Sequence, residues 1–110
     1  MKYPDRLAML IRRKQPYIDW ANAFDDDGPK YNDERDHATV FLIDEVVDAS
    51  DIKKVLRRYW RDIFDEQLNS WMRDPDDWPQ RRTFSVFMKW FEVEICDLVV
   101  DLGRWPIQYD

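Results

Sequence analysis

The sequence has little of the residue types on which common cofactor and metal sites depend. Among 110 residues there are two glycines, one cysteine and one histidine. A P-loop and a dinucleotide-binding turn both need several glycines close together, whereas Gly28 and Gly103 lie far apart. Cys96 and His37 cannot complete a closed zinc site by themselves, and a single cysteine excludes a disulfide within one chain. We therefore expect no metal, no cofactor and a reducing compartment.

Long hydrophobic runs are also missing. Near the N-terminus the apolar residues 7–11 are followed at once by Arg12, Arg13 and Lys14. A membrane-spanning helix needs about 20 apolar residues, and a signal peptide carries its positive charge before the apolar run. We expect a cytoplasmic protein with no membrane partner.

Charge is distributed unevenly along the chain, whose net charge is −6. Residues 21–51 hold ten acidic side chains against two basic ones, beginning with Asp25, Asp26 and Asp27. A net-acidic chain binds nucleic acid poorly, because Lys and Arg contacts to phosphate supply most of that affinity. We do not expect a nucleic-acid partner. An acidic mimic or inhibitor that occupies a basic protein surface is one hypothesis for this block.

Five basic residues gather early in the strongest predicted helix, namely Lys53, Lys54, Arg57, Arg58 and Arg61. The helix dipole disfavours each cation near the N-terminus of a helix by roughly a few tenths of a kcal/mol. Solvation or pairing with the acidic block of the same chain explains the cluster simply. An anionic partner is the alternative.

Helical periodicity is clearest over residues 51–72. Asp48 or Ser50 can cap the start of this helix, and Pro75 follows its end. Its apolar residues recur three and four positions apart: Ile52, Val55, Leu56, Tyr59, Trp60, Ile63, Phe64, Leu68, Trp71 and Met72.

A second long helix is predicted over residues 84–102, with Thr83 as its N-cap and Gly103 just after its end. Valine and isoleucine are dense over residues 93–100, so a strand there is the alternative. We favour the helix, because its charged residues then form one polar stripe: Glu94, Asp97 and Asp101.

The remaining elements complete an α+β domain over residues 1–110. Residues 8–13 and 39–43 are predicted strands, and Pro16 begins a short helix that ends near Phe24. The alternating tail 105–109 is a candidate edge strand. We predict two layers, with a small two- or three-stranded sheet packed against two long amphipathic helices and the short one.

Two segments carry candidate binding residues, which are Asp19, Trp20 and Asn22 on the short helix and Trp78, Arg81 and Arg82 in the proline-containing linker. An aromatic face beside guanidinium groups can hold an anion, a peptide or a base. The simpler interpretation makes Trp78 a plug between the long helices, with Asp19 and Asn22 in local hydrogen bonds.

A second apolar stripe on the helix over 84–102 predicts contact with another chain. Trp90 and Val93 lie on this stripe, and Trp105 adds a large ring in the tail. The chain holds 17 aromatic residues, more than a core of this size conceals, and aromatic residues anchor protein interfaces.

The leading functional hypothesis is a non-enzymatic interaction protein that forms a homodimer or binds another protein. The alternative is a small enzyme or ligand-binding domain with a pocket near Asp19, Trp20, Trp78 and Arg82. We predict no catalytic residue, because Cys96 falls within the apolar predicted helix, where cysteine is usually a buried hydrophobe.

Several motifs resemble a family of small uncharacterised bacterial proteins. They comprise residues 14–20 (KQPYIDW), 41–45 (FLIDE), the stretch from Trp71 to Thr83 with its tryptophans and prolines, Trp90-Phe91, and Asp101-Leu102. The resemblance implies a proline where Asp44 stands here. It supports the predicted fold and implies no activity.

Overall fold

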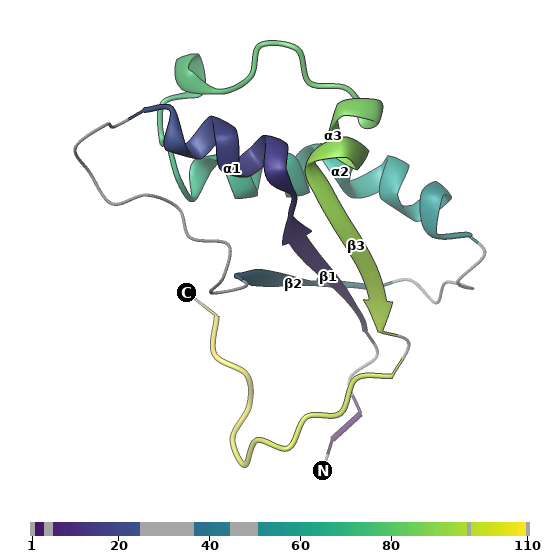
Figure 1. The fold of residues 1–110 in the computed structure, drawn as a ribbon. Helices are drawn as coiled ribbons and strands as arrows, with labels where there is room; N and C mark the ends of the chain where they lie inside the picture. Colours follow the sequence, from purple (N-terminus) through teal and green to yellow (C-terminus); the bar gives the residue numbers. More distant parts are fainter. Residues whose placement is uncertain (1, 4–5, 25–36, 45–50, 97, 110) are drawn as a thin grey trace.

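The computed structural model describes residues 2–3, 6–24, 37–44, 51–96 and 98–109 (Figure 1). The elements occur in the order β1 (Leu7–Arg13), α1 (Gln15–Asn22), β2 (Ala38–Ile43), α2 (Ile52–Asn69), the 3-10 turn η3 (Pro75–Asp77), α3 (Phe84–Trp90) and β3 (Phe91–Cys96). The predicted α+β class is confirmed, with a three-stranded sheet and three α-helices in the part described.

The sheet is antiparallel, and β1 is its central strand in the order β2-β1-β3. Met9 pairs with Phe41 on one side and with Ile95 on the other, so these side chains share one face. Leu10 pairs with Val40 and with Glu94, and this row lies on the opposite face. The pairing register therefore sorts the strands into an apolar inner face and a mixed outer face.

The three α-helices lie on one side of the sheet, so the molecule has two layers (Figure 1). The core forms between this layer and the inner face of β1, where Met9 and Ile11 are fully buried. Burying a side chain of this size stabilises the fold by about 1.5–3 kcal/mol. The largest fully buried side chains are Tyr17, Phe64, Phe87, Phe91, Met9, Ile11, Leu56, Ile63, Leu68 and Gln67.

The helix predicted over residues 51–72 is confirmed as α2, which ends three residues earlier. Its buried positions are Val55, Leu56, Ile63, Phe64, Gln67 and Leu68, on one stripe with helical spacing. Asp51 occupies the N-cap position without a side-chain capping bond. The capping residues predicted at 48 and 50 lie outside the described residues.

The short helix α1 also agrees with the prediction. Pro16 lies in its first turn, where the missing N–H costs nothing. The Tyr17 hydroxyl donates a hydrogen bond of 2.6 Å to the Gln67 carbonyl oxygen, and the Arg13 guanidinium lies 4.3 Å from the Tyr17 ring centroid. These contacts join α1 to both α2 and the end of β1.

The second long helix predicted over residues 84–102 is wrong beyond Trp90. Thr83 caps α3 as expected, since its hydroxyl accepts a bond of 3.1 Å from the Val86 N–H. At Phe91, however, the backbone is extended (φ −135°, ψ 142°), and the chain continues directly as β3. The strand alternative, placed over residues 93–100, was nearer the structure but began two residues too late.

The end of α3 is stabilised by Lys14, the residue that follows β1. The Lys14 backbone N–H donates to the Trp90 carbonyl at 2.8 Å, and the Lys14 ammonium donates to the Met88 carbonyl at 3.2 Å. Both groups satisfy carbonyls that a helix leaves without partners at its C-terminus. Lys14 thus supplies partners for the end of the helix, and the local sequence of α3 does not show them.

An extended part of the structure, which we call the terminal arm, comprises residues 98–109 beyond β3 together with residues 2–3 near the N-terminus. Lys2 and Asp101 exchange two backbone hydrogen bonds of 2.7 and 2.8 Å. The predicted edge strand over 105–109 is wrong, because these described residues have no strand partner. Gly103 ends no helix; its N–H donates to the Asp101 carboxylate at 2.7 Å, an approach that a Cβ would obstruct.

The terminal arm makes the molecule long. Its principal extents are 46 × 32 × 24 Å and its radius of gyration is 15.6 Å. A compact domain of this length has a radius of gyration of about 13 Å. Much of the arm therefore lies away from the core.

Candidate functional site

Among the candidate binding residues of α1, Asp19 makes a local contact and Trp20 a long-range one. The Asp19 carboxylate accepts a hydrogen bond of 2.8 Å from the Gln15 amide, one turn earlier. The half-buried Trp20 donates its indole N–H to the Asp77 carbonyl at 3.0 Å, which ties α1 to the linker. Asn22, at the end of α1, is half-buried and also has a partner. Asp19 is thus oriented by its own helix.

The linker between α2 and α3, residues 73–82, folds back on itself around Trp78. The half-buried Trp78 indole donates to the Met72 carbonyl at 2.7 Å, and its ring packs against the core. The Arg82 guanidinium lies 5.5 Å from the Trp78 ring centroid and donates to the Pro79 carbonyl at 2.6 Å. Arg81 is exposed. Stacking and hydrogen bonding therefore hold the Arg82 head group in one orientation.

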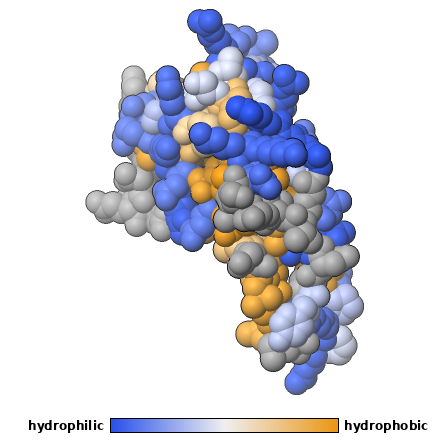
Figure 2. Space-filling view, turned by 90° about the vertical axis from the view of Figure 1, so that its right-hand side faces the viewer, coloured by the Kyte–Doolittle hydropathy of each residue, from blue (hydrophilic) through white to orange (hydrophobic). Residues whose placement is uncertain are grey.

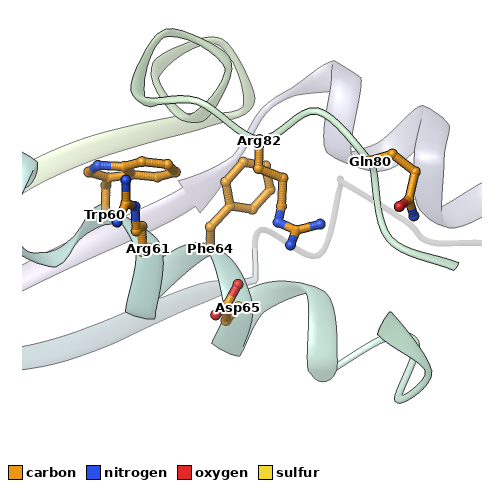
Figure 3. A pocket seen from close by; sticks show the side chains of 6 residues that line it. All are labelled: Trp60, Arg61, Phe64, Asp65, Gln80 and Arg82. Carbon is orange, nitrogen blue, oxygen red and sulfur yellow. The ribbon is translucent and has the colours of Figure 1, made fainter. Parts of the chain in front are cut away.

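A cleft of about 210 Å³ separates α2 from the linker. Its lining residues are Trp60, Arg61, Phe64, Asp65, Gln80 and Arg82. Figure 3 shows the Arg82 guanidinium directed from the linker toward α2, with the Phe64 ring and the Asp65 carboxylate rising from the helix below it. We call this site the arginine cleft.

The arginine cleft contains only one of the four residues from the predicted pocket. Arg82 lines it, whereas Asp19, Trp20 and Trp78 do not. The sequence did not identify Trp60, Asp65 or Gln80 as site residues, and it placed Arg61 only in the basic cluster of α2. The four-residue spacing of Arg61 and Asp65 was a usable signal, since it puts both on one helix face.

Of the predicted interface residues, two are packed within the chain. Trp90 is half-buried, and its ring centroid lies 6.2 Å from that of Tyr17 and 5.6 Å from that of Phe64. Val93 is half-buried on the inner face of β3 and contacts the core. Trp105 is 75% exposed, on the terminal arm. Trp105 is therefore the one of the three that offers most of its ring to a partner.

The terminal arm carries a large apolar surface. Figure 2 shows hydrophobic atoms continuing from the body of the molecule onto its lower end, where the terminal segments lie in Figure 1. An open groove of about 420 Å³ runs along the arm, lined by Lys2, Tyr3, Asp101, Pro106, Ile107 and Tyr109. Its lining gives a partner both aromatic and aliphatic contacts.

The mixed outer face of the sheet carries a second apolar surface, which we call the open sheet face. It comprises Ala8, Leu10, Val40, Leu42 and Cys96. Val40 is 54% exposed and Leu42 is 42% exposed. Glu94 lies on the same side of the sheet, in one row with Leu10 and Val40, and forms an ion pair of 3.1 Å with Arg12. Among the described elements, the α-helices cover only the other face of the sheet.

The structure corrects the expectation for Cys96. The thiol is exposed on β3 instead of being buried in a helix. His37 precedes β2 next to Ala38, which pairs with Arg12, whereas Cys96 pairs with Ala8. Arg12 and Ala8 are four residues apart on β1, so the row next to His37 and the row that contains Cys96 lie about 13 Å apart. This separation gives no support to a Cys–His catalytic pair.

Within the described ranges, no three His, Cys, Asp or Glu side chains are grouped so that they could hold a metal ion. Among the described helices, none has the length and apolar character needed to cross a membrane. The acidic run 25–27, on which the mimic hypothesis depends, lies outside the described residues.

Comparison of the chain with models of protein families, with curated proteins and with solved structures finds no match. The resemblance to a small bacterial family therefore stays a prediction. The functional argument depends on the surfaces described above.

Proposed function

We propose that the protein is a small interaction protein that self-associates, with the terminal arm of one copy packed on the open sheet face of another. The supporting observation is the distribution of exposed hydrophobic side chains. Ten large hydrophobic residues are exposed among the described residues, and nine of them belong to these two surfaces. They are Tyr3, Leu98, Val100, Leu102, Trp105, Ile107 and Tyr109 on the arm, and Val40 and Leu42 on the sheet.

Exposed apolar side chains concentrated in this way favour an interface, because monomeric proteins rarely leave large contiguous apolar patches in water. Leu102 and Tyr109 are each at least 80% exposed, so their own domain covers little of them. An apolar partner surface would remove this area from water at about 25 cal/mol per Å². The open sheet face offers such a surface.

A second copy is the partner that these features favour. Trp105, Ile107 and Tyr109 alternate as in a strand with one covered side, although residues 105–109 have no strand partner among the described residues. Each copy carries both an arm and an open face, so a two-fold pair would bury both surfaces twice and close. Arg104 on the arm is also opposite in charge to Glu92 and Glu94 of β3. Reciprocal arm exchange would therefore bury both surfaces of each copy in one type of contact.

Sedimentation equilibrium of the full chain and of single variants tests this proposal. We expect the wild type to dimerise and both Trp105→Asp and Leu42→Asp to shift the protein to monomer, because each places a charge in the apolar contact. Phe24→Asp is the matched control, since Phe24 is an exposed aromatic residue outside both surfaces. A wild-type monomer at every concentration, or an equal effect of Phe24→Asp, would contradict self-association.

The reactivity of Cys96 reports separately on the open sheet face. Its exposed thiol lies on this face, so a partner's arm would shield it. We expect the rate of alkylation to fall as the protein concentration rises, and to be independent of concentration in Trp105→Asp. A dimer in which Cys96 remains fully reactive would show that the arm contacts some other surface.

A further inference from the structure

The arginine cleft holds two guanidinium groups that are oriented before any ligand binds. Arg61 lies 5.2 Å from the Trp60 ring centroid, and Arg82 lies over Trp78 while donating to the Pro79 carbonyl. Stacking on an aromatic face restricts a long side chain. Less conformational entropy is then lost when a ligand binds.

Most of the donors in the cleft have no acceptor within the described chain. Arg61 makes no hydrogen bond or ion pair with a described group, and Arg82 uses one of its five N–H donors. The two residues come from segments far apart in sequence, and both line the same cleft of about 210 Å³. Spare guanidinium donors that line one cleft favour an oxyanion ligand.

The charge of the lining favours a monoanion over a dianion. Arg61 and Arg82 contribute two positive charges and Asp65 one negative charge, so the lining carries +1. A monoanion neutralises this charge, whereas a phosphate dianion leaves one negative charge uncompensated, which is costly to remove from water. A carboxylate group therefore complements this cleft better than a phosphate.

Size and lining then limit the rest of the ligand. Pockets for drug-sized molecules measure about 300–1,000 Å³, so this smaller cleft suits the end of one side chain. Trp60 and Phe64 add an aromatic wall that can contact methylene groups. We infer that the arginine cleft binds the carboxylate of a glutamate side chain presented by an acidic peptide segment of a partner protein.

Nuclear magnetic resonance titration of the full-length protein tests this inference. The probe is the peptide acetyl-Gly-Glu-Gly-amide, and the readouts are the Trp60 indole N–H and the arginine Nε–H resonances. We expect saturable shifts with a Kd on the order of 1 mM, because exposed ion pairs contribute little each. The peptide with Gln in place of Glu should cause no saturable shift. Inorganic phosphate should bind more weakly than the Glu peptide.

Variants locate the binding to the cleft. Arg61→Gln and Arg82→Gln should each weaken peptide binding severalfold, as expected for the loss of one exposed ion pair. Arg73→Gln is the matched control, because Arg73 is an exposed arginine outside the lining. Asp65→Asn should strengthen binding severalfold, since it removes the repelling charge. All four substitutions are at exposed positions, so a folded spectrum is expected for each.

Three results would overturn the inference: equal binding of the Gln peptide, tighter binding of phosphate, or an equal loss in Arg73→Gln. The outcome is independent of self-association, because the cleft shares no residue with the terminal arm or the open sheet face. A Trp105→Asp monomer that still binds the Glu peptide would show that the two properties are separate.

Discussion

The Tyr17 hydroxyl and the Gln67 carbonyl oxygen lie 2.6 Å apart in the core, where they form the hydrogen bond that links α1 to α2. Ser70 donates a second bond of 2.8 Å to the same carbonyl. The Gln67 side chain accepts from Arg13 and donates to Thr39 on β2. One buried glutamine thus joins α2 to both β1 and β2, while its carbonyl holds α1.

Tyr17→Phe should lower the free energy of unfolding by about 1 kcal/mol. The loss stays moderate because Ser70 continues to satisfy the Gln67 carbonyl. Urea unfolding followed by fluorescence measures the difference. Tyr109→Phe removes the same hydroxyl from an exposed residue and should leave stability unchanged. Equal effects of the two substitutions would contradict a buried hydrogen bond at Tyr17.

Thr83→Ala should destabilise the protein by about 1 kcal/mol, because it removes the hydroxyl that accepts from the Val86 N–H at the start of α3. Ser85→Ala is the control within the same helix. Ser85 is exposed after the cap, so its replacement by a better helix former should be neutral or slightly stabilising. Thermal unfolding of both variants gives the comparison. A neutral Thr83→Ala would show that the cap contributes nothing.

Core packing predicts a contrast between two isoleucines. Ile63→Val should cost about 0.5–1.5 kcal/mol, since Ile63 is fully buried in α2 and the lost methylene leaves a void. Ile107→Val, on the terminal arm, should cost less than about 0.5 kcal/mol in the monomer. Chemical denaturation at low protein concentration measures both. A larger effect at Ile107 would show that the arm is packed within the monomer.

Alkaline pH should weaken the fold through Tyr59. Burial raises the pKa of Tyr59 above its usual value of 10.0, and the Asp44 carboxylate, which accepts its hydroxyl at 3.2 Å, raises it further. A raised pKa means that the folded state favours the neutral phenol. This contribution to stability is complete below pH 10.0 and is lost as the pH rises through the raised pKa.

Ultraviolet titration of tyrosinate tests this behaviour. In Asp44→Asn the pKa of Tyr59 should fall but remain above 10.0, because the effect of burial persists. Tyr59→Phe should lose less stability than the wild type above that pH. An unchanged Tyr59 titration in Asp44→Asn would contradict the proposed contact.

The sequence allowed α2 to be predicted because its apolar stripe continues over five turns with charged residues between. The boundary between α3 and β3 could not be found in the same way. Phe91 and Ile95 fit a helical spacing, whereas Phe91, Val93 and Ile95 fit a strand equally well. Pairing with β1 decides between the two, and Lys14, more than 70 residues earlier, donates a hydrogen bond to the last carbonyl of the helix.

The sequence identified only some of the features that form the arginine cleft. Arg61 belonged to the recognised basic cluster and Arg82 to the recognised linker, but nothing local indicated that they would line one cleft. Both arginines line this cleft because the linker turns back over α2. The bond from Trp78 to the Met72 carbonyl fixes this turn. The hydrogen bond of a single indole, together with its packing against the core, therefore helps to position the site.

The direct passage from Trp90 into Phe91 also limits how the chain can change in length. With no loop between α3 and β3, one inserted residue would have no place to be absorbed. Every later side chain of β3 would then exchange faces, turning Glu92 and Glu94 toward the core and Val93 and Ile95 toward solvent. A viable insertion at this junction must therefore contain an even number of residues or be long enough to form a loop.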